Sequence, residues 1–234
     1  MGDVIDLASS VLAQAAQRLD VAGQNISNAT VNGYKRVISF SSTLSASKTD
    51  NIGSTYRLDL TPGKEVQTGN SYDLSIEGDG FFIVASPHGL YYTRAGQFQR
   101  DGDGRLLTSA GLALQSDSGG DLTLSKDKVQ VQLDGTVLED GQPTGKIAIA
   151  AITDPSSAQY VGGGVISAPE SAVGSVDAPS IRQGSYEASN VSSSTEMVSM
   201  MLALRQAEAG QKLVNVYDEM MGRVIDSFSQ AGGS

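Results

Sequence analysis

Residues that break helices are confined to the middle of this 234-residue chain. All six prolines lie between Pro62 and Pro179, and most of the 27 glycines fall in the same stretch rather than near the two ends. Proline and glycine interrupt helices and mark turns, so long helices fit only into the terminal segments. The distribution predicts an α+β chain in which N- and C-terminal helices bracket a glycine-rich central region.

Apolar residues in the first segment recur at alternating spacings of three and four. This spacing is typical of a coiled-coil seam, and the small alanines within it favour the close approach of a second helix. The alternative is an amphipathic helix that packs only on its own domain. The seam residues are Ile5, Ala8, Leu12, Ala15, Leu19, Ala22 and Ile26.

The last segment predicts a second long helix that begins at Ser193 and runs without proline to the end of the chain. Ser193 and Glu196 have the spacing of a capping box. The helix carries two apolar faces, and five of the six methionines lie in it, which suits packing against several different partners. A plain core helix is the alternative. The face that we expect to pair with the first helix, of the same chain or of an adjacent copy, comprises Val198, Leu202, Leu213, Val216, Met220 and Val224, and the second face includes Met197, Met201 and Leu204.

Between the helices, the apolar pattern changes to a period of two. Residues 81–85 and 90–93 form a predicted hairpin around Pro87, His88 and Gly89, and residues 129–133 and 136–138 form another around an Asp-Gly turn. Such short, evenly spaced strands predict a central antiparallel all-β domain. Further strands are expected at 74–77, 97–100, 105–108, 112–115, 121–124 and 146–152.

These patterns divide the chain into four predicted parts. Residues 1–36 form the N-terminal helix with an Asn-rich turn, and 37–70 form an extended connector. Residues 71–180 form the β domain, and 181–234 form a second connector with the C-terminal helix. Residues 1–36 and 190–230 are expected to pair as one discontinuous helical domain.

Composition excludes several functions. The absence of cysteine removes disulfides, thiolate metal sites and cysteine nucleophiles, and one histidine is too few for the usual catalytic metal sites. A net charge of −10 argues against nucleic-acid binding. No apolar run is long enough to insert into a membrane, and acids at Asp3 and Asp6 argue against a cleaved signal peptide.

No catalytic or cofactor-binding motif is complete. The stretch Asp101-Gly102-Asp103-Gly104 begins like a calcium loop, but Arg105 occupies the position of the next ligand, so a β-turn is the better interpretation. His88, at a hairpin tip, lacks the partners of a catalytic triad. We expect no enzyme activity, no metal, no cofactor and no small-molecule substrate.

Three stretches resemble the bacterial flagellar rod and hook family. They are NISNATVNGYKR at 25–36, TGNSYDLSIEGDGFFIV at 68–84 and GSYEASNVSSSTEMVSMMLALRQAEAGQKLVNVYDEMM at 184–221. They occur in the same order as in the family and extend over nearly the whole chain. The short connection at 41–67 with Thr61-Pro62-Gly63 resembles the proximal rod proteins more than the distal rod or hook proteins.

The resemblance implies a structural subunit of the flagellar basal-body rod. Family members leave the cell through the flagellar type III export apparatus without a cleaved signal, and their terminal helices pair as a coiled coil near the axis of the assembly. The implied partners are copies of the chain and other rod and hook proteins, in the rod that crosses the periplasmic space. The alternatives are a distal rod or hook subunit or, in another class, a secreted β-rich binding module or hydrolase.

Under the same hypothesis, Asn25, Asn28, Asn32 and Gly33 end the first helix and turn the chain, because asparagine and glycine tolerate a left-handed backbone.

Overall fold

The computed structural model describes residues 2–40, 55–126, 128–176 and 178–231, and it describes the side chains of residues 5–39, 56–126, 128–176 and 178–223. These residues divide into two compact units. The helical unit contains residues 2–26, 39–40 and 192–231. The β unit contains residues 27–38 and the described part of 55–191. The segment that follows the first helix therefore belongs to the β unit.

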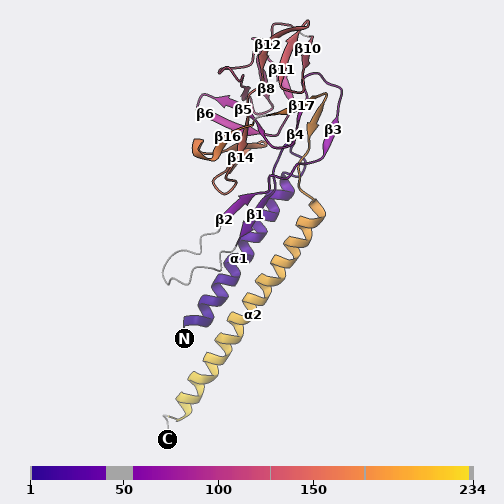
Figure 1. The fold of residues 1–234 in the computed structure, drawn as a ribbon. Helices are drawn as coiled ribbons and strands as arrows, with labels where there is room; N and C mark the ends of the chain where they lie inside the picture. The colour runs from indigo at the N-terminus through magenta and orange to yellow at the C-terminus, as the bar shows by residue number, and fades with distance from the viewer. Residues whose placement is uncertain (1, 41–54, 127, 177, 232–234) are drawn as a thin grey trace. The chain divides into compact units, whose positions relative to one another are not determined.

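Two long helices account for most of the described helical unit, as the distribution of prolines predicted (Figure 1). They are α1 (Gly2–Ser27) and α2 (Ser193–Ala231). Neither contains proline, and α2 begins at the predicted residue with Glu196 in its first turn, where a negative charge is favourable. Both helices are long, but neither is apolar enough over its described residues to span a bilayer.

The β unit is built from short strands, the first of which, β1, ends in residues 39–40 of the helical unit. They are β1 (Val37–Phe40), β2 (Thr55–Leu58), β3 (Glu65–Gln67), β4 (Leu74–Glu77), β5 (Phe81–Ser86), β6 (Gly89–Thr93), β7 (Phe98–Arg100), β8 (Leu106–Thr108), β9 (Ala113–Leu114), β10 (Val129–Val131), β11 (Thr136–Glu139), β12 (Gln142–Lys146), β13 (Ile149–Ile152), β14 (Gln159–Gly162), β15 (Val165–Ser167), β16 (Val173–Ser175), β17 (Ser180–Gln183) and β18 (Ser185–Glu187), with a 3₁₀ turn at Glu170–Ala172.

The largest sheet has nine strands and contains the predicted β5–β6 hairpin. Its main path runs β14-β15-β6-β5-β9-β8-β7, and β13 joins it beside β5 with β16 on its outer side. A second sheet, β10-β11-β12, contains the other predicted hairpin. The Asp101–Gly104 stretch forms a tight turn between β7 and β8, in which the Gly104 amide donates to the Asp101 carbonyl over 3.1 Å. The described strand pairs among β3 to β18 are antiparallel, which confirms the predicted sheet type.

The structure differs from the sequence prediction in the two expected connectors. Strands β1, β2 and β3 lie within the connector expected at 37–70, and β17 and β18 lie at 180–187, where the second connector was expected to begin. Strands β14, β15 and β16 lie inside the expected β domain, at positions where no strand was predicted. Two of these strands pair with partners far along the chain, because β17 pairs with β4 and β18 pairs with β3. The strand expected at 121–124 is reduced to isolated bridges at Asp121 and Thr123. Residues 41–54 of the predicted connector lie outside the described residues.

The core of the β unit lies between the sheets and is made of aliphatic and aromatic side chains. Phe82 and Phe98 meet edge to face, with ring centroids 5.4 Å apart. The buried cluster comprises Leu74, Ile76, Phe82, Val84, Phe98, Leu106, Leu114, Leu122, Leu124, Val129, Val137, Ile147 and Ile181.

Candidate functional site: an exposed helix face and a chain junction

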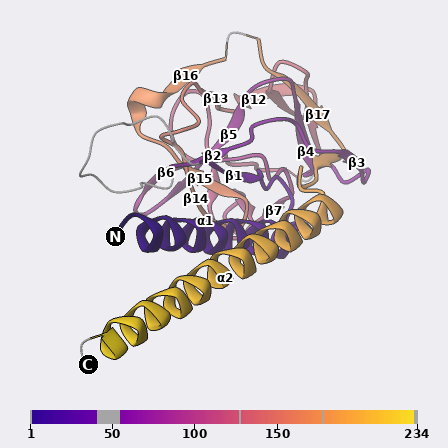
Figure 2. The same ribbon diagram turned by 90° about the horizontal axis from the view of Figure 1, so that it is seen from below.

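The two helices of the helical unit run antiparallel and touch at three levels (Figure 2). The Asn25 side-chain amide donates to the Glu196 carboxylate over 3.2 Å, and the Arg18 guanidinium donates to the Gln206 side chain over 3.1 Å. Further along, Leu12 lies against Gly210. As the residue number falls along α1, the number of its contact on α2 rises.

The predicted seam of α1 is buried at its alanines. Ala8, Ala15 and Ala22, which are seven residues apart, are buried, whereas Ile5 is exposed. Leu12, Leu19 and Ile26 are half-buried.

On α2, the buried positions also recur every seven residues, and within this single chain they do not include the residues expected to pair. Glu196, Ala203 and Gly210 are buried. Periodicity alone could not decide which of two apolar faces meets α1, and small residues allow the closer approach. Of the residues expected to pair, Val198, Leu202, Leu213, Val216 and Met220 are exposed, and the side chain of Val224 lies outside the described side chains.

The exposed apolar residues of both predicted faces of α2 together form a long apolar surface, which we call the exposed α2 face. Leu202 is 59% exposed and Met220 is 60% exposed. Exposed apolar patches rimmed by polar residues are typical of association sites in soluble proteins. The exposed α2 face comprises Met197, Val198, Met201, Leu202, Leu204, Leu213, Val216 and Met220.

We expect Gly210→Val to weaken the contact between the helices, with a cost of about 1–3 kcal/mol for overpacking. A Cβ atom at Gly210 would lie 3.1 Å from Leu12 Cγ and Cδ2 and 3.4 Å from Val11 Cγ1. At Gly222, in the same helix, a Cβ would meet nothing within 4 Å, so Gly222→Val is the matched control. Hydrogen exchange of α1 amides measures the difference, and equal exchange in both variants would contradict the contact.

In the β unit, all three stretches that carry the family resemblance meet around residues 27–38, which we call the junction segment. The Gly33 amide donates to the Glu187 carbonyl over 2.8 Å. Tyr34 is fully buried, and its ring packs edge to face on Tyr160 at 4.7 Å. The backbone of Tyr34 and of Arg36 is bonded to Asn190, which lies just ahead of α2 in the sequence.

The residues predicted to turn the chain act in different ways. Gly33 has a φ of +69°, and a Cβ there would lie 2.0 Å from the Ala95 nitrogen, so its left-handed backbone and lack of side chain are both required. Asn25 lies inside α1, and neither Asn28 nor Asn32 is left-handed. Those two asparagines contribute hydrogen bonds instead. Asn28 accepts one from the Tyr160 hydroxyl, and Asn32 donates one to the Gln97 side chain.

A buried group of charged residues, Lys35, Arg94 and Glu187, fixes the junction segment, and we call it the ion cluster. The side chains of Lys35 and Arg94 are 0% and 2% exposed, and that of Glu187 is 6% exposed. The Lys35 ammonium lies 2.6 Å from Glu187 Oε1, and Arg94 Nη1 lies 3.0 Å from Glu187 Oε2. One carboxylate thus faces two cations.

Backbone groups complete the ion cluster. Lys35 also donates to the Thr61 carbonyl over 2.7 Å, and the Gly63 amide donates to Glu187 Oε1 over 2.7 Å. Arg94 donates to the carbonyls of Ile76 and Gly78, at the end of β4. The cluster therefore joins segments that are as much as 152 residues apart in the sequence.

Burial sets the protonation behaviour of the cluster. It lowers the pKa of the Lys35 ammonium from its ordinary value of 10.5, and the Glu187 carboxylate opposes this shift. Burial likewise lowers the pKa of Arg94, again against the effect of Glu187.

We expect the free energy of unfolding of the natural chain to rise, relative to that of Lys35→Met, as the pH approaches 10.5. Between the lowered pKa of folded Lys35 and its unfolded value, the unfolded chain holds a proton that the folded chain has lost, so stability rises with pH. Urea unfolding of both chains from neutral pH upward measures the difference. Parallel pH profiles would contradict the lowered pKa.

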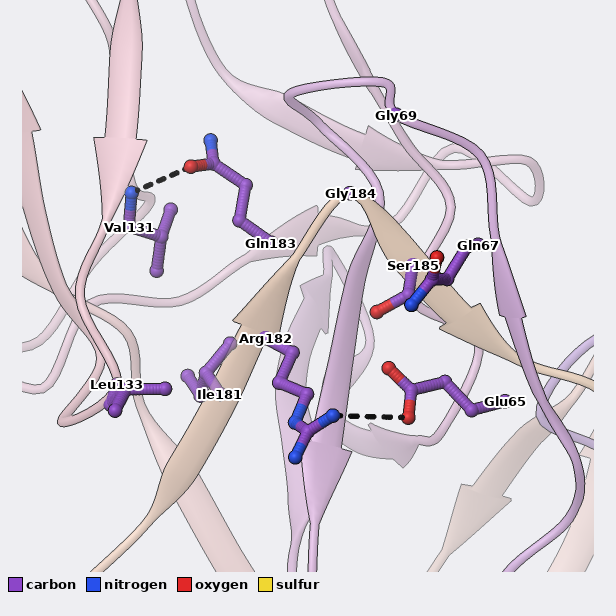
Figure 3. Close-up of a pocket in the computed structure, with 10 residues that line it drawn as sticks. All are labelled: Glu65, Gln67, Gly69, Val131, Leu133, Ile181, Arg182, Gln183, Gly184 and Ser185. Atoms are coloured by element: carbon purple, nitrogen blue, oxygen red, sulfur yellow. Dashed lines mark hydrogen bonds and ion pairs between the residues drawn. The ribbon is translucent and has the colours of Figure 1, made fainter.

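The described residues contain no arrangement that indicates catalysis. No group of three or more His, Asp or Glu among them could hold a metal ion. A cavity of about 440 Å³ lies between β3, β17 and residues 131–133 (Figure 3). Two of its polar side chains have partners within the cavity lining: Arg182 lies 3.8 Å from Glu65, and Gln183 accepts a hydrogen bond from the Val131 amide.

Helices that precede and follow an antiparallel β unit in the sequence define an α+β protein whose distinctive surface is a helix face rather than a pocket. Comparisons with known proteins agree with this class. The family described as "Flagellar hook protein FlgE/F/G D1 domain" matches residues 75–142, and "Flagellar basal body rod FlgEFG protein C-terminal" matches residues 182–227.

Relatives match from about three quarters to nine tenths of the chain. Flagellar basal-body rod protein FlgF of Caulobacter vibrioides is 30% identical, over 90% of this chain and 91% of that protein. FlgG of Bacillus subtilis is 25% identical, over 89% and 92%, and FlgG of Borreliella burgdorferi is 32% identical, over 73% and 69%. The chain belongs to the flagellar basal-body rod protein family.

Proposed function

We propose that the chain is a structural subunit of the bacterial flagellar rod and performs no catalysis. The relatives that match most of its length are named basal-body rod proteins, which supports this role. The absence of a metal-binding group among the described residues is compatible with it. The location that follows is the flagellar basal body, in the rod where it crosses the periplasmic space, after export by the flagellar type III apparatus without a cleaved signal.

The exposed α2 face is the observation that carries the proposal. Fully burying one leucine, valine or methionine side chain is worth about 1.5–3 kcal/mol, so eight such residues exposed on one helix favour burial against neighbouring chains. In our proposal, α1 and α2 pair as a coiled coil, and their outer faces pack on adjacent subunits. The α1 seam and the exposed α2 face, continued by Val224, are then the assembly interface.

Head-to-tail contacts between unlike surfaces generate open helical assemblies. A chain with an apolar α2 face and a different α1 surface has the two unlike surfaces that such assembly needs. The partners are copies of the chain and other rod or hook proteins. Among rod positions, we propose the proximal one, that of FlgF, supported by 30% identity to FlgF against 25% to FlgG of Bacillus subtilis over about the same length, and by the short connection in the sequence after α1.

Electron microscopy of basal bodies from a strain lacking this chain tests the function. We expect basal bodies that stop before a complete rod, and restoration when the natural chain is supplied. If assembly stops after a complete proximal rod, the chain is instead a subunit of the distal rod. Complete rods bearing hooks in its absence would overturn the proposal.

A further inference from the structure

The ion cluster has an imbalance of charge that makes Glu187 indispensable to it. Two cations, Lys35 and Arg94, lie in the protein interior and share one carboxylate. The Nε–H of Arg94 has no hydrogen-bond partner among the described residues, and its guanidinium lies over the Phe81 ring at 5.2 Å. An ion left in the interior without its counter-ion is strongly unfavourable.

The three charges come from different parts of the chain. Lys35 lies in the junction segment that follows α1, and Arg94 follows β6 in the main sheet. Glu187 is the last residue of β18, shortly before α2; β18 pairs with β3, and its Ser185 hydroxyl also lies 2.8 Å from that of Ser75 in β4. Burial of Lys35 therefore depends on a strand near the far end of the chain.

Strand β18 and the residues just after it also hydrogen-bond to the backbone of the junction segment. The Glu187 carbonyl accepts the Gly33 amide, and Asn190 binds the backbone of Tyr34 and of Arg36. Until β18 is in place, the junction segment lacks both its counter-ion and these hydrogen bonds.

We propose that the ion cluster is a latch that lets the junction segment pack on the β unit only after β18 has paired with β3. The junction segment, which follows α1, can then pack only when β18, which precedes α2, is in place. When β18 is absent or unpaired, Lys35 is solvated and residues 27–38 are released, while the main sheet stays folded.

Limited trypsin digestion of the full chain tests the latch. Cleavage after Arg36 reports release of the junction segment, and cleavage after Arg100, in β7, reports opening of the main sheet. In Glu187→Gln, which keeps the shape but removes the charge, we expect cleavage after Arg36 to accelerate by roughly a hundredfold, because two cations lose their counter-ion. Cleavage after Arg100 should be unchanged.

Lys35→Met is the matched control. It leaves Arg94 and Glu187 as a balanced pair, and Glu187 Oε1 keeps the Gly63 amide. The Thr61 carbonyl keeps the Asn190 side-chain amide as a donor over 3.0 Å. We expect cleavage after Arg36 to stay within about threefold of that in the natural chain, because Arg94 remains paired with Glu187 and no buried ion loses its counter-ion.

Two results would overturn the latch. One is a Glu187→Gln chain that protects Arg36 as well as the natural chain does. The other is a chain in which cleavage after Arg36 and after Arg100 accelerates equally, because the cluster would then be a general stability element. If Glu187→Gln yields no folded β unit, the same digestion of Glu187→Asp, which keeps the charge on a shorter side chain, tests the latch instead. The latch requires an intermediate rate after Arg36 with Arg100 protected, and loss of both protections, or of neither, overturns it.

Discussion

Replacing Leu202 by aspartate is expected to leave the single chain folded and to abolish rod assembly. Leu202 is 59% exposed, so the charge is solvated in the free chain and costs little there. In the proposed assembly the same position is covered by a neighbouring subunit. The interface then loses about 1.5–3 kcal/mol of apolar burial and must take up a carboxylate without a partner, which costs several kcal/mol more.

The control is Ser109→Asp, which adds the same charge elsewhere in the chain. Ser109 is exposed and lies in a turn of the β unit, outside both helices. Circular dichroism of the purified chains checks folding, and motility with microscopy of basal bodies checks assembly. Complete rods and normal motility with Leu202→Asp would remove the exposed α2 face from the assembly interface.

Replacing Gly96 by alanine is expected to destabilise the β unit by about 3 kcal/mol or more, since the added methyl has no space. A Cβ atom at Gly96 would lie 1.6 Å from the Leu74 carbonyl oxygen and 2.8 Å from its carbon. The obstacle is backbone, which cannot rotate away as a side chain can. Leu74 belongs to the buried core, and its amide donates to the Gly96 carbonyl over 2.9 Å, so any shift also breaks this bond.

Gly102→Ala is the matched control, because a Cβ there would meet nothing within 4 Å and its φ is not positive. Such a replacement is neutral or slightly stabilising, since alanine restricts the unfolded chain. The urea concentration at the midpoint of unfolding measures both variants. Equal midpoints for Gly96→Ala and Gly102→Ala would show that the approach of Leu74 to Gly96 is not required.

The sequence predicted the elements that depend on local patterns. The position of the prolines predicted both helices, and alternation with turn residues predicted the β5–β6 and β10–β11 hairpins. Strands β17 and β18 were missed because they are short, polar and paired with β4 and β3, more than 100 residues earlier. Nothing local distinguishes such strands from a connector.

The candidate functional site was only partly predicted, because it too depends on contacts between residues that are far apart in the sequence. The apolar residues of α2 were visible in the sequence, but the choice of the face that meets α1 depends on the close approach allowed by Ala203 and Gly210. The ion cluster was missed because charged residues are usually solvated. A signal was present, since Lys35 and Glu187 both lie in stretches that carry the family resemblance.

The hydrogen bonds between Asn190 and the backbone of Tyr34 and Arg36 place the entry and the exit of the β unit side by side. In the sequence, the β unit is an insertion between the two helices, and these hydrogen bonds hold its two ends together. Its outer turns can therefore be lengthened without separating those ends. The turn at Gly119 and Gly120, where added atoms would meet nothing within 4 Å, is a suitable place to graft a peptide epitope or a fluorescent domain.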